Sequence, residues 1–388
     1  MSKTYLEAFS RLSPLDWCSL LEEEGPKGIL GAPPIARLCG YDHSGLGVEL
    51  HWEGVSIGRG LKAILGAPPK YDLKAPPGRP REPGSGECFN PLLHPRILPA
   101  QGESGFPGCV ELDGRLVGVP DLEPLQSRSP CSCSKRAPRA SGPPSIGGAR
   151  IVGAECTLAS TPGGRRVISC LGGGATLLYS EGQAVARGPL ALEVDCADYR
   201  VGVLHPGGPV YMYATHSVEV EANAITVECP TASLYASSPW GVRLRASPGR
   251  LEVEGLQGRP YALGSGGPLR AARSLFELLT PPDSRGPEGG LGHARCANCA
   301  GSSLVDGETI WFYAWTPAGS PGILELRFSK PVAPRVLVVD ALGEDWVPVE
   351  RGLTRIPLPP GWHVVAAVEL EKRGIAEILR ERLGRARG

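Results

Sequence analysis

The alternation of apolar and polar residues along residues 149–254 predicts a run of short β-strands. Turn residues, as at Thr161–Gly164 and Pro206–Pro209, interrupt this alternation about every 8 to 12 residues. The expected strands are Arg150–Leu158, Arg165–Leu171, Ala175–Glu181, Leu190–Asp195, Tyr199–His205, Val210–Thr215, Ser217–Ala222, Ala224–Cys229, Thr231–Ala236, Gly241–Ala246 and Arg250–Glu254. In Ser217–Glu221 and Leu251–Glu254, Val or Leu lies on one face and Glu on the other, so one sheet surface should meet water.

One clear helix separates these strands from a second run. We expect it over Pro268–Leu279, because Leu269, Ala272, Leu275 and Phe276 fall on a common helical face. The later strands are expected at Glu308–Trp315, Gly322–Phe328, Arg335–Asp340, Thr354–Leu358 and Trp362–Leu370. The pattern as a whole predicts a mainly β fold of antiparallel, sandwich-like domains with a few peripheral helices.

Both ends of the chain have helical patterns. Ser13 and Pro14 form a typical helix start near the N-terminus, and an amphipathic helix is expected from Lys372. Between them, Lys27–Pro34 recurs as Lys62–Pro69, and two copies indicate related turns or hairpins and not a solenoid.

The composition divides the chain into five expected regions. These are a Pro/Gly-rich α+β region (1–123), a basic linker or insertion (124–148), an antiparallel β domain (149–265), a connector with the helix and a Cys-x-x-Cys motif (266–300), and a sandwich-like domain with the C-terminal helix (301–388). The basic segment lacks acidic residues and has little apolar content, which favours a linker or a surface insertion.

Charge and composition narrow the classes of partner. The 388-residue chain has 40 basic and 40 acidic residues, and this balance disfavours a nucleic-acid partner. No run of 18 apolar residues and no apolar signal core are present, which predicts a cytoplasmic protein with no membrane partner. Scarce Asn, Gln and Met, with many Pro, are typical of thermophile proteins, some of which keep disulfides inside the cell. A GC-rich genome, which also enriches Gly, Pro, Ala and Arg, is the alternative explanation.

The sharpest local motif is formed by His293, Cys296 and Cys299. A Cys-x-x-Cys turn with a nearby His suits tetrahedral zinc, so zinc is a candidate cofactor. A closed site would need a fourth ligand, for which Cys131, Cys133, His94 and Cys88 are candidates by residue type. A disulfide, buried thiols and redox chemistry remain alternatives, although the β-rich context does not offer the thioredoxin-like setting of a redox motif.

Two further cysteine pairs are candidate disulfides. Cys156 and Cys170 flank the Thr161–Gly164 turn almost symmetrically, so a hairpin would bring them face to face. Cys196 and Cys229 each lie near the end of an expected strand. The alternative for all four is that they are small buried residues.

Catalytic signals are weak. The chain lacks a nucleophile elbow, a phosphate-binding loop, a dinucleotide fingerprint and a His-Glu-x-x-His motif. Asp42 and His43 could form an acid–base cluster, although surface hydrogen bonding is the more common role. His205 and His216 could meet across neighbouring strands to bind a metal or a substrate, or could be core histidines.

The aromatic maximum of the chain is a candidate ligand platform. Trp311, Tyr313 and Trp315 alternate along one expected strand, where stacking on sugar rings competes with packing in a core.

Residues 322–370 resemble the C-terminal accessory β-sandwich of α-mannosidase-type glycoside hydrolases. The resemblance is carried by Gly322–Phe328, the turn Asp340–Glu344, the proline-led strand Ile356–Pro360 and the last strand Val364–Leu370. Such domains are accessory, so the resemblance implies no catalytic residue.

These observations favour a non-catalytic accessory or binding protein, with carbohydrate as a candidate ligand. One alternative is a hydrolase or metalloenzyme whose site lies between the N-terminal region and the β domain. Another is a structural or assembly protein whose sheet surfaces form a homo-oligomer.

Overall fold

The structure of the protein is a computed structural model. It describes residues 88–370 except 103–104, 113, 129–132, 134–138, 143, 173, 206–207, 215–216, 280–288, 307–308, 318–319, 341–342 and 361–362. The expected N-terminal helix, the repeat, Asp42, His43, His216 and the C-terminal helix lie outside the described residues.

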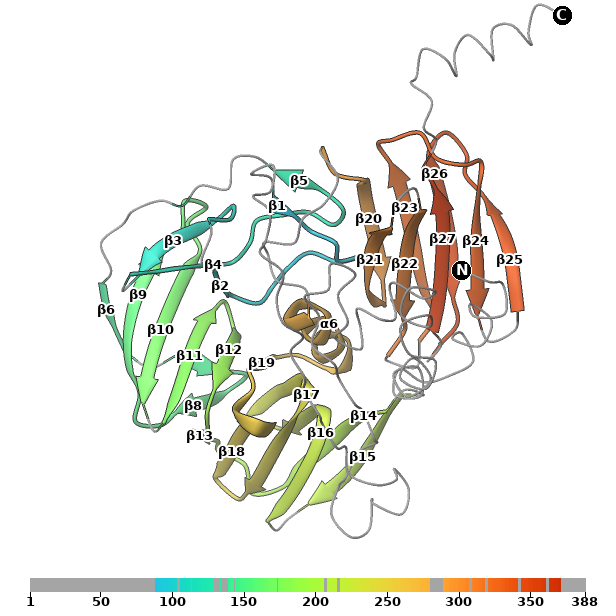
Figure 1. The fold of residues 1–388 in the computed structure, drawn as a ribbon. Helices are drawn as coiled ribbons and strands as arrows, with labels where there is room; N and C mark the ends of the chain where they lie inside the picture. Colours follow the sequence, from blue (N-terminus) through green and yellow to red (C-terminus); the bar gives the residue numbers. More distant parts are fainter. Residues whose placement is uncertain are drawn as a thin grey trace, which may run out of the picture.

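The fold of the described residues is mainly β, as predicted from the alternation (Figure 1). Neighbouring strands pair antiparallel throughout. One α-helix, α6 (Pro268–Leu279), occupies the predicted range, and a short 3-10 helix spans Leu256–Gly258. No helix in this part of the chain has the length and apolar character needed to cross a membrane.

The largest sheet has fourteen strands and curls around a shared core. Its strands are β6 (Arg139–Ser141), β7 (Ser145–Ile146), β8 (Ala149–Ile151), β9 (Glu155–Ser160), β10 (Arg166–Gly172), β11 (Ala175–Ser180), β12 (Gln183–Arg187), β13 (Leu190–Glu193), β14 (Tyr199–His205), β15 (Gly208–Ala214), β16 (Val218–Cys229), β17 (Ala232–Ser247), β18 (Arg250–Gly255) and β19 (Tyr261–Ser265). Two of them, β6 and β7, lie in the basic segment 124–148. The proposed domain boundaries stay a prediction.

Two long strands replace four shorter ones that the pattern predicted. Strand β16 contains a bulge between Ala222 and Ala224, and β17 continues through Pro239. The Asn223 amide donates hydrogen bonds of 3.2 Å to the Ser238 carbonyl and 3.1 Å to the Pro239 carbonyl. The bulge therefore accommodates a proline that would normally end a central strand.

Two smaller sheets lie near the start of the described residues. One pairs β1 (Cys88–Phe89) with β5 (Ser127–Arg128), and the other has the order β2 (Ala100–Gly102), β4 (Arg115–Gly118), β3 (Cys109–Leu112). Val110, Leu112 and Val117 of the second sheet share an apolar cluster with Ala159 and Val167 of the large sheet. This packing fixes the small sheet against the large one.

The C-terminal strands form a two-sheet sandwich. One sheet contains β20 (Gly292–Ala297), β23 (Gly322–Phe328) and β26 (Leu353–Leu358), and the other contains β21 (Ala300–Asp306), β22 (Thr309–Trp315), β27 (His363–Glu369), β24 (Arg335–Asp340) and β25 (Gly343–Pro348). Inward residues of both sheets, including Leu326 and Phe312, belong to one core cluster. Burial of these alternate apolar positions is the main stabilisation of such a sandwich.

Helix α6 lies between the large sheet and the sandwich (Figure 1). Its Phe276 ring packs 5.6 Å from the Tyr313 ring of the sandwich. On the other side, the Tyr235 hydroxyl lies 2.6 Å from the Ser274 hydroxyl and donates to the Gln183 side chain. Gly264 makes this arrangement possible, because an added Cβ would lie 2.0 Å from the side-chain amide oxygen of Gln183.

Candidate functional site

The structure places His293 and the Cys-x-x-Cys residues on or beside strand β20, with Cys296 and Cys299 joined by a disulfide. His293 is exposed, and its Nδ1 lies 2.8 Å from the Gln126 amide nitrogen. Sulfurs bonded to each other are not the thiolates that zinc requires. In the part of the chain that the structure describes, no group of three His, Cys, Asp or Glu residues is arranged to hold a metal.

The two candidate pairs of cysteines also stand as disulfides. Cys156 and Cys170 are opposite residues of β9 and β10, with their Cα atoms 4.1 Å apart. Cys196 is bonded to Cys229 across a 6.2 Å Cα separation. A further disulfide, Cys109–Cys133, was not foreseen, because only the folded chain brings the small sheet beside residue 133.

The predicted cytoplasmic location is wrong. Every described cysteine is disulfide-bonded, with four pairs formed between described residues. Disulfides form and persist in oxidising compartments, whereas cytosolic thiols are kept reduced. The four pairs therefore point to an oxidising, extracellular or secreted environment.

The aromatic strand of the sandwich turns two of its candidate residues inward. Tyr313 is fully buried and Trp315 is 6% exposed, while Trp311 occupies a β22 position opposite Leu304 and Ala367. Two of the three candidate platform side chains are therefore core residues, and the role of Trp311 stays a prediction. His205 ends β14 opposite Gly208, and the described residues do not show it beside His216.

A buried acid and histidine meet where α6 contacts residues 94–98. The Glu277 carboxylate accepts hydrogen bonds from the backbone N–H of Ile97 at 3.0 Å and of Leu98 at 2.8 Å, and His94 Nε2 lies 3.8 Å away. Burial raises the pKa of Glu277 to about 7, although Arg96 and the two backbone N–H groups oppose the rise. Burial and the charges of Arg273 and Arg96 hold the pKa of His94 well below its usual value.

This cluster ties elements together and does not face solvent. Both Glu277 oxygens accept hydrogen bonds from backbone N–H groups, and the side chains of Glu277 and His94 are buried. One turn earlier on α6, the Arg273 guanidinium donates to the carbonyls of Cys296 at 2.9 Å and Cys299 at 3.1 Å. Residues that are close together on one helix thus hold both the 94–98 segment and the Cys-x-x-Cys turn.

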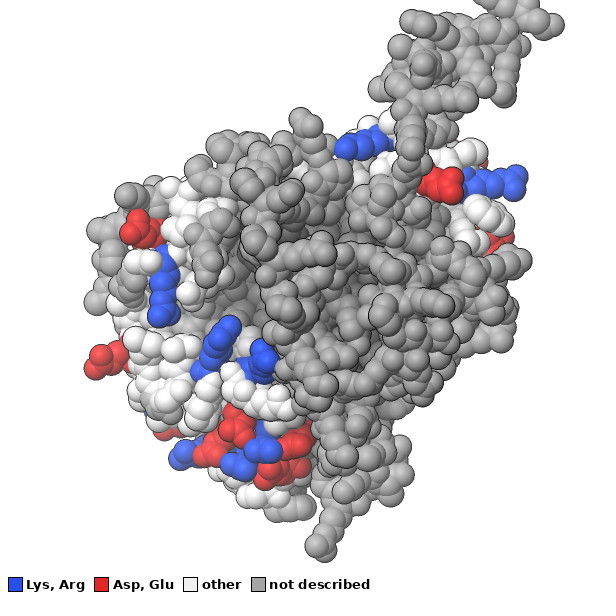
Figure 2. All heavy atoms as spheres, in the orientation of Figure 1, with Lys and Arg blue, Asp and Glu red and all other residues white. Residues whose placement is uncertain are grey.

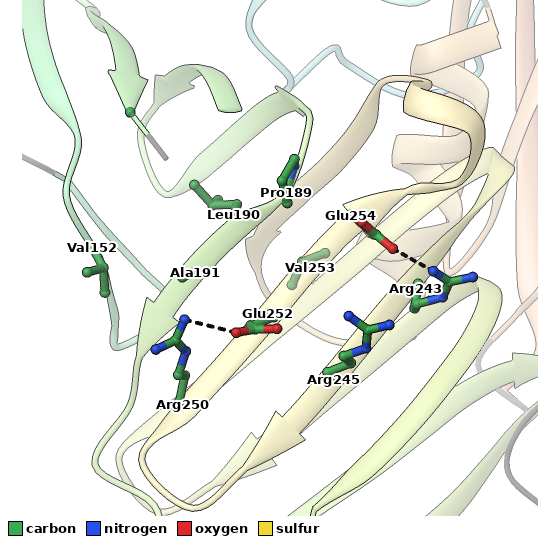
Figure 3. A pocket seen from close by; sticks show the side chains of 11 residues that line it. Val152, Pro189, Leu190, Ala191, Arg243, Arg245, Arg250, Glu252, Val253 and Glu254 are labelled. Carbon is green, nitrogen blue, oxygen red and sulfur yellow. Dashed lines mark hydrogen bonds and ion pairs between the residues drawn. The ribbon is translucent and has the colours of Figure 1, made fainter. Parts of the chain in front are cut away.

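The candidate ligand site is a groove of about 220 Å³ on the outer face of the large sheet, which is the face turned away from the core (Figure 3). Val152, Pro189 and Ala191 contribute an apolar wall. The charged lining residues are Arg243, Arg245, Arg250, Glu252 and Glu254. The groove therefore combines apolar contact with hydrogen-bond donors and acceptors.

Strand alternation and register together build this groove. On β17, Val242 and Leu244 point into the core, so Arg243 and Arg245 point outward. Register places Glu219, Arg245, Glu252 and Ala191 in one row across β16, β17, β18 and β13. Because Ala191 carries only a methyl group, the charged row ends in a hollow.

Ion pairs order the charged side of the groove. Arg243 Nη1 lies 2.7 Å from Glu254 Oε1, and Arg250 Nη2 lies 2.9 Å from Glu252 Oε1. Burial lowers the pKa of Arg243, but hydrogen bonding and the charges of Glu221 and Glu254 outweigh it and leave the pKa raised. Acidic and basic side chains are interleaved over β16 to β18 in Figure 2, so the groove belongs to a mixed-charge surface.

The sequence pattern also did not predict that two tyrosines of β15, Tyr211 and Tyr213, are exposed. Tyr213 is 79% exposed, and the Arg200 guanidinium lies 4.2 Å from the centre of the Tyr211 ring. The alternation around residues 210–215 predicted a strand but not which face would stay uncovered. For the groove, by contrast, the outward Glu residues of Leu251–Glu254 were a usable signal.

The chain has no match among family models or curated proteins and only a distant likeness to a solved structure. Among solved structures, the chain is similar to a glycoside hydrolase family 81 protein from Clostridium thermocellum, with 10% identity and a TM-score of 0.19, over 66% of this chain and 34% of that one. The chain thus spans about a third of that structure's length. A likeness at this TM-score carries no argument, and a mannosidase-type accessory domain finds no specific support.

Removal of individual disulfides should destabilise the protein in the order of the loops they close. The Cys196–Cys229 bond spans 33 residues and the Cys296–Cys299 bond only 3. Closing the longer loop restricts the unfolded chain more, so its paired Cys→Ser variant should lose about 4 kcal/mol and the other about 2 kcal/mol. Denaturant unfolding without reductant measures both losses. Free thiols at these four positions in the folded protein would contradict the disulfide assignment.

The stability of the protein should depend on pH through Glu277. Its folded pKa of about 7 exceeds the unfolded value of about 4.5, so its stabilising contribution is complete below pH 4.5 and disappears as pH rises through 7. The size of the loss is about 3 kcal/mol. His94 acts in the opposite sense, because its lowered pKa removes stability as pH falls below 6.5.

Urea unfolding of the wild type and of Glu277→Gln between pH 4.5 and 8 isolates this contribution. As pH rises, the free energy of unfolding of the wild type should fall relative to that of Glu277→Gln. Glu350→Gln, at an exposed position, is the control and should show the same pH dependence as the wild type. Parallel pH profiles for the wild type and Glu277→Gln would show that the buried carboxyl does not titrate in this range.

Proposed function

We propose that the protein is a non-catalytic binding protein that holds a saccharide in the groove of strands β13, β17 and β18. The observation that carries the proposal is the lining itself. An apolar wall of Val152, Pro189 and Ala191 faces arginine and glutamate side chains across one hollow. Sugar rings present both C–H faces and hydroxyl groups, and hydroxyls donate to carboxylates and accept from guanidinium groups.

The size of the groove supports a small ligand unit. Its volume of about 220 Å³ lies below the roughly 300–1,000 Å³ of pockets that enclose drug-sized molecules. A groove of this size suits one ring of a longer chain, with the neighbouring rings outside it. Strand positions hold the lining side chains, and sites on strands are better fixed than sites on loops.

The test is calorimetric titration of the full chain with neutral and acidic oligosaccharides. Ala191→Phe should reduce affinity at least about tenfold, because the ring would fill the hollow while its strand position stays outward. Gln101→Phe, at an exposed position of another sheet, is the matched control and should bind like the wild type. Thermal unfolding of both variants checks that the fold is retained.

Three results would contradict the proposal. Wild-type affinity in Ala191→Phe would remove the groove as the site, and absence of binding to every saccharide would remove the ligand class. Release of new reducing ends during incubation would instead favour the hydrolase alternative.

A further inference from the structure

The groove contains one arginine whose hydrogen-bonding capacity is largely unused. Arg245 Nε donates to Glu219 Oε2 at 3.1 Å, and its side chain is 52% exposed. Within the described residues, neither terminal nitrogen of this guanidinium has a hydrogen-bond or ion-pair partner. Figure 3 shows Arg245 between Glu252 and Arg243, with its guanidinium turned into the groove.

The surrounding carboxylates are engaged by other arginines. Glu252 pairs with Arg250, and Glu254 pairs with Arg243. Glu219, the partner of Arg245, lies 3.3 Å from Arg243 as well. The hydrogen bond that Arg245 donates to Glu219, together with the charge of that carboxylate, raises the pKa of Arg245, and the charge of Arg243 acts against this rise. A bound anion at Arg245 would offset this like-charge contact.

From this geometry we infer that the groove selects a carboxylated sugar, a uronic acid residue, whose carboxylate binds the terminal nitrogens of Arg245. The inference rests on the proposed saccharide function and names its ligand class. A guanidinium presents parallel N–H groups that match the two oxygens of a carboxylate. The apolar wall of Val152 and Pro189 then lies beside the sugar ring.

The charge of the lining favours a carboxylate over a doubly charged group. Three arginines and two glutamates line the groove, and Glu219 and Glu221 pair with Arg245 and Arg243 beside it. With so many carboxylates nearby, the single negative charge of a uronate is repelled less than a double charge. A phosphate dianion would bring a second charge close to Glu252 and Glu254, where like charges repel.

The experiment compares galacturonic and glucuronic acid oligomers with the corresponding neutral galactose and glucose oligomers, by calorimetry on the full chain. The acidic oligomers should bind up to about fivefold more tightly to the wild type, since that is the contribution of a partly exposed charge pair. Arg245→Gln should bind acidic and neutral oligomers equally. Arg245→Lys should keep part of the preference, because an ammonium keeps the charge but not the two-pronged geometry.

Arg355→Ala is the matched control. Arg355 forms an exposed pair with Glu325 in the sandwich, with 2.8 Å between Nε and Oε2, so this variant should keep the wild-type preference. Higher salt should weaken binding of the acidic oligomers and leave the neutral ones unchanged.

The outcomes separate the two proposals. Equal affinity of the wild type for acidic and neutral oligomers would overturn the uronate inference and leave the saccharide proposal standing. Absence of binding to either class would overturn both. Competition by inorganic phosphate or sulfate as strong as by monomeric uronate would identify a general anion site and also overturn the inference.

Discussion

The packing of helix α6 between the large sheet and the sandwich is the constraint on which the rest of the structure depends. Its apolar residues fill the space between the two, but its buried polar groups determine how they fit. Ser274 meets Tyr235, Arg273 reaches the carbonyls of the Cys-x-x-Cys turn, and Glu277 binds the backbone at residues 97 and 98. Buried polar groups are costly unless satisfied, so these contacts admit one arrangement of the parts.

The same packing explains where the groove lies. Tyr235 and Arg243 are both outward residues of β17, on either side of the irregularity at Ser238 and Pro239. Helix α6 covers the sheet at the Tyr235 end, while the Arg243 end carries charged side chains. One face of a single long strand thus serves packing at one end and offers a candidate ligand surface at the other.

The disulfides stabilise a chain in which many strands are short. Cys156–Cys170 joins two neighbouring strands, whereas Cys109–Cys133 links segments that are 24 residues apart. Such bonds restrict the unfolded chain and point to an oxidising environment. They also alter the meaning of the Cys-x-x-Cys motif, which in this structure is a bonded turn held by Arg273.

Residue pattern alone determined the mainly antiparallel β class and the range of α6, because periods of two and 3.6 are local properties of the chain. It also indicated the outward Glu residues of β18. Only the tertiary structure decided that Tyr313 is core, that Glu277 is buried, and that Arg245, Glu252 and Ala191 form one row across three strands. These depend on register and on contacts between residues distant in sequence, which no local period contains.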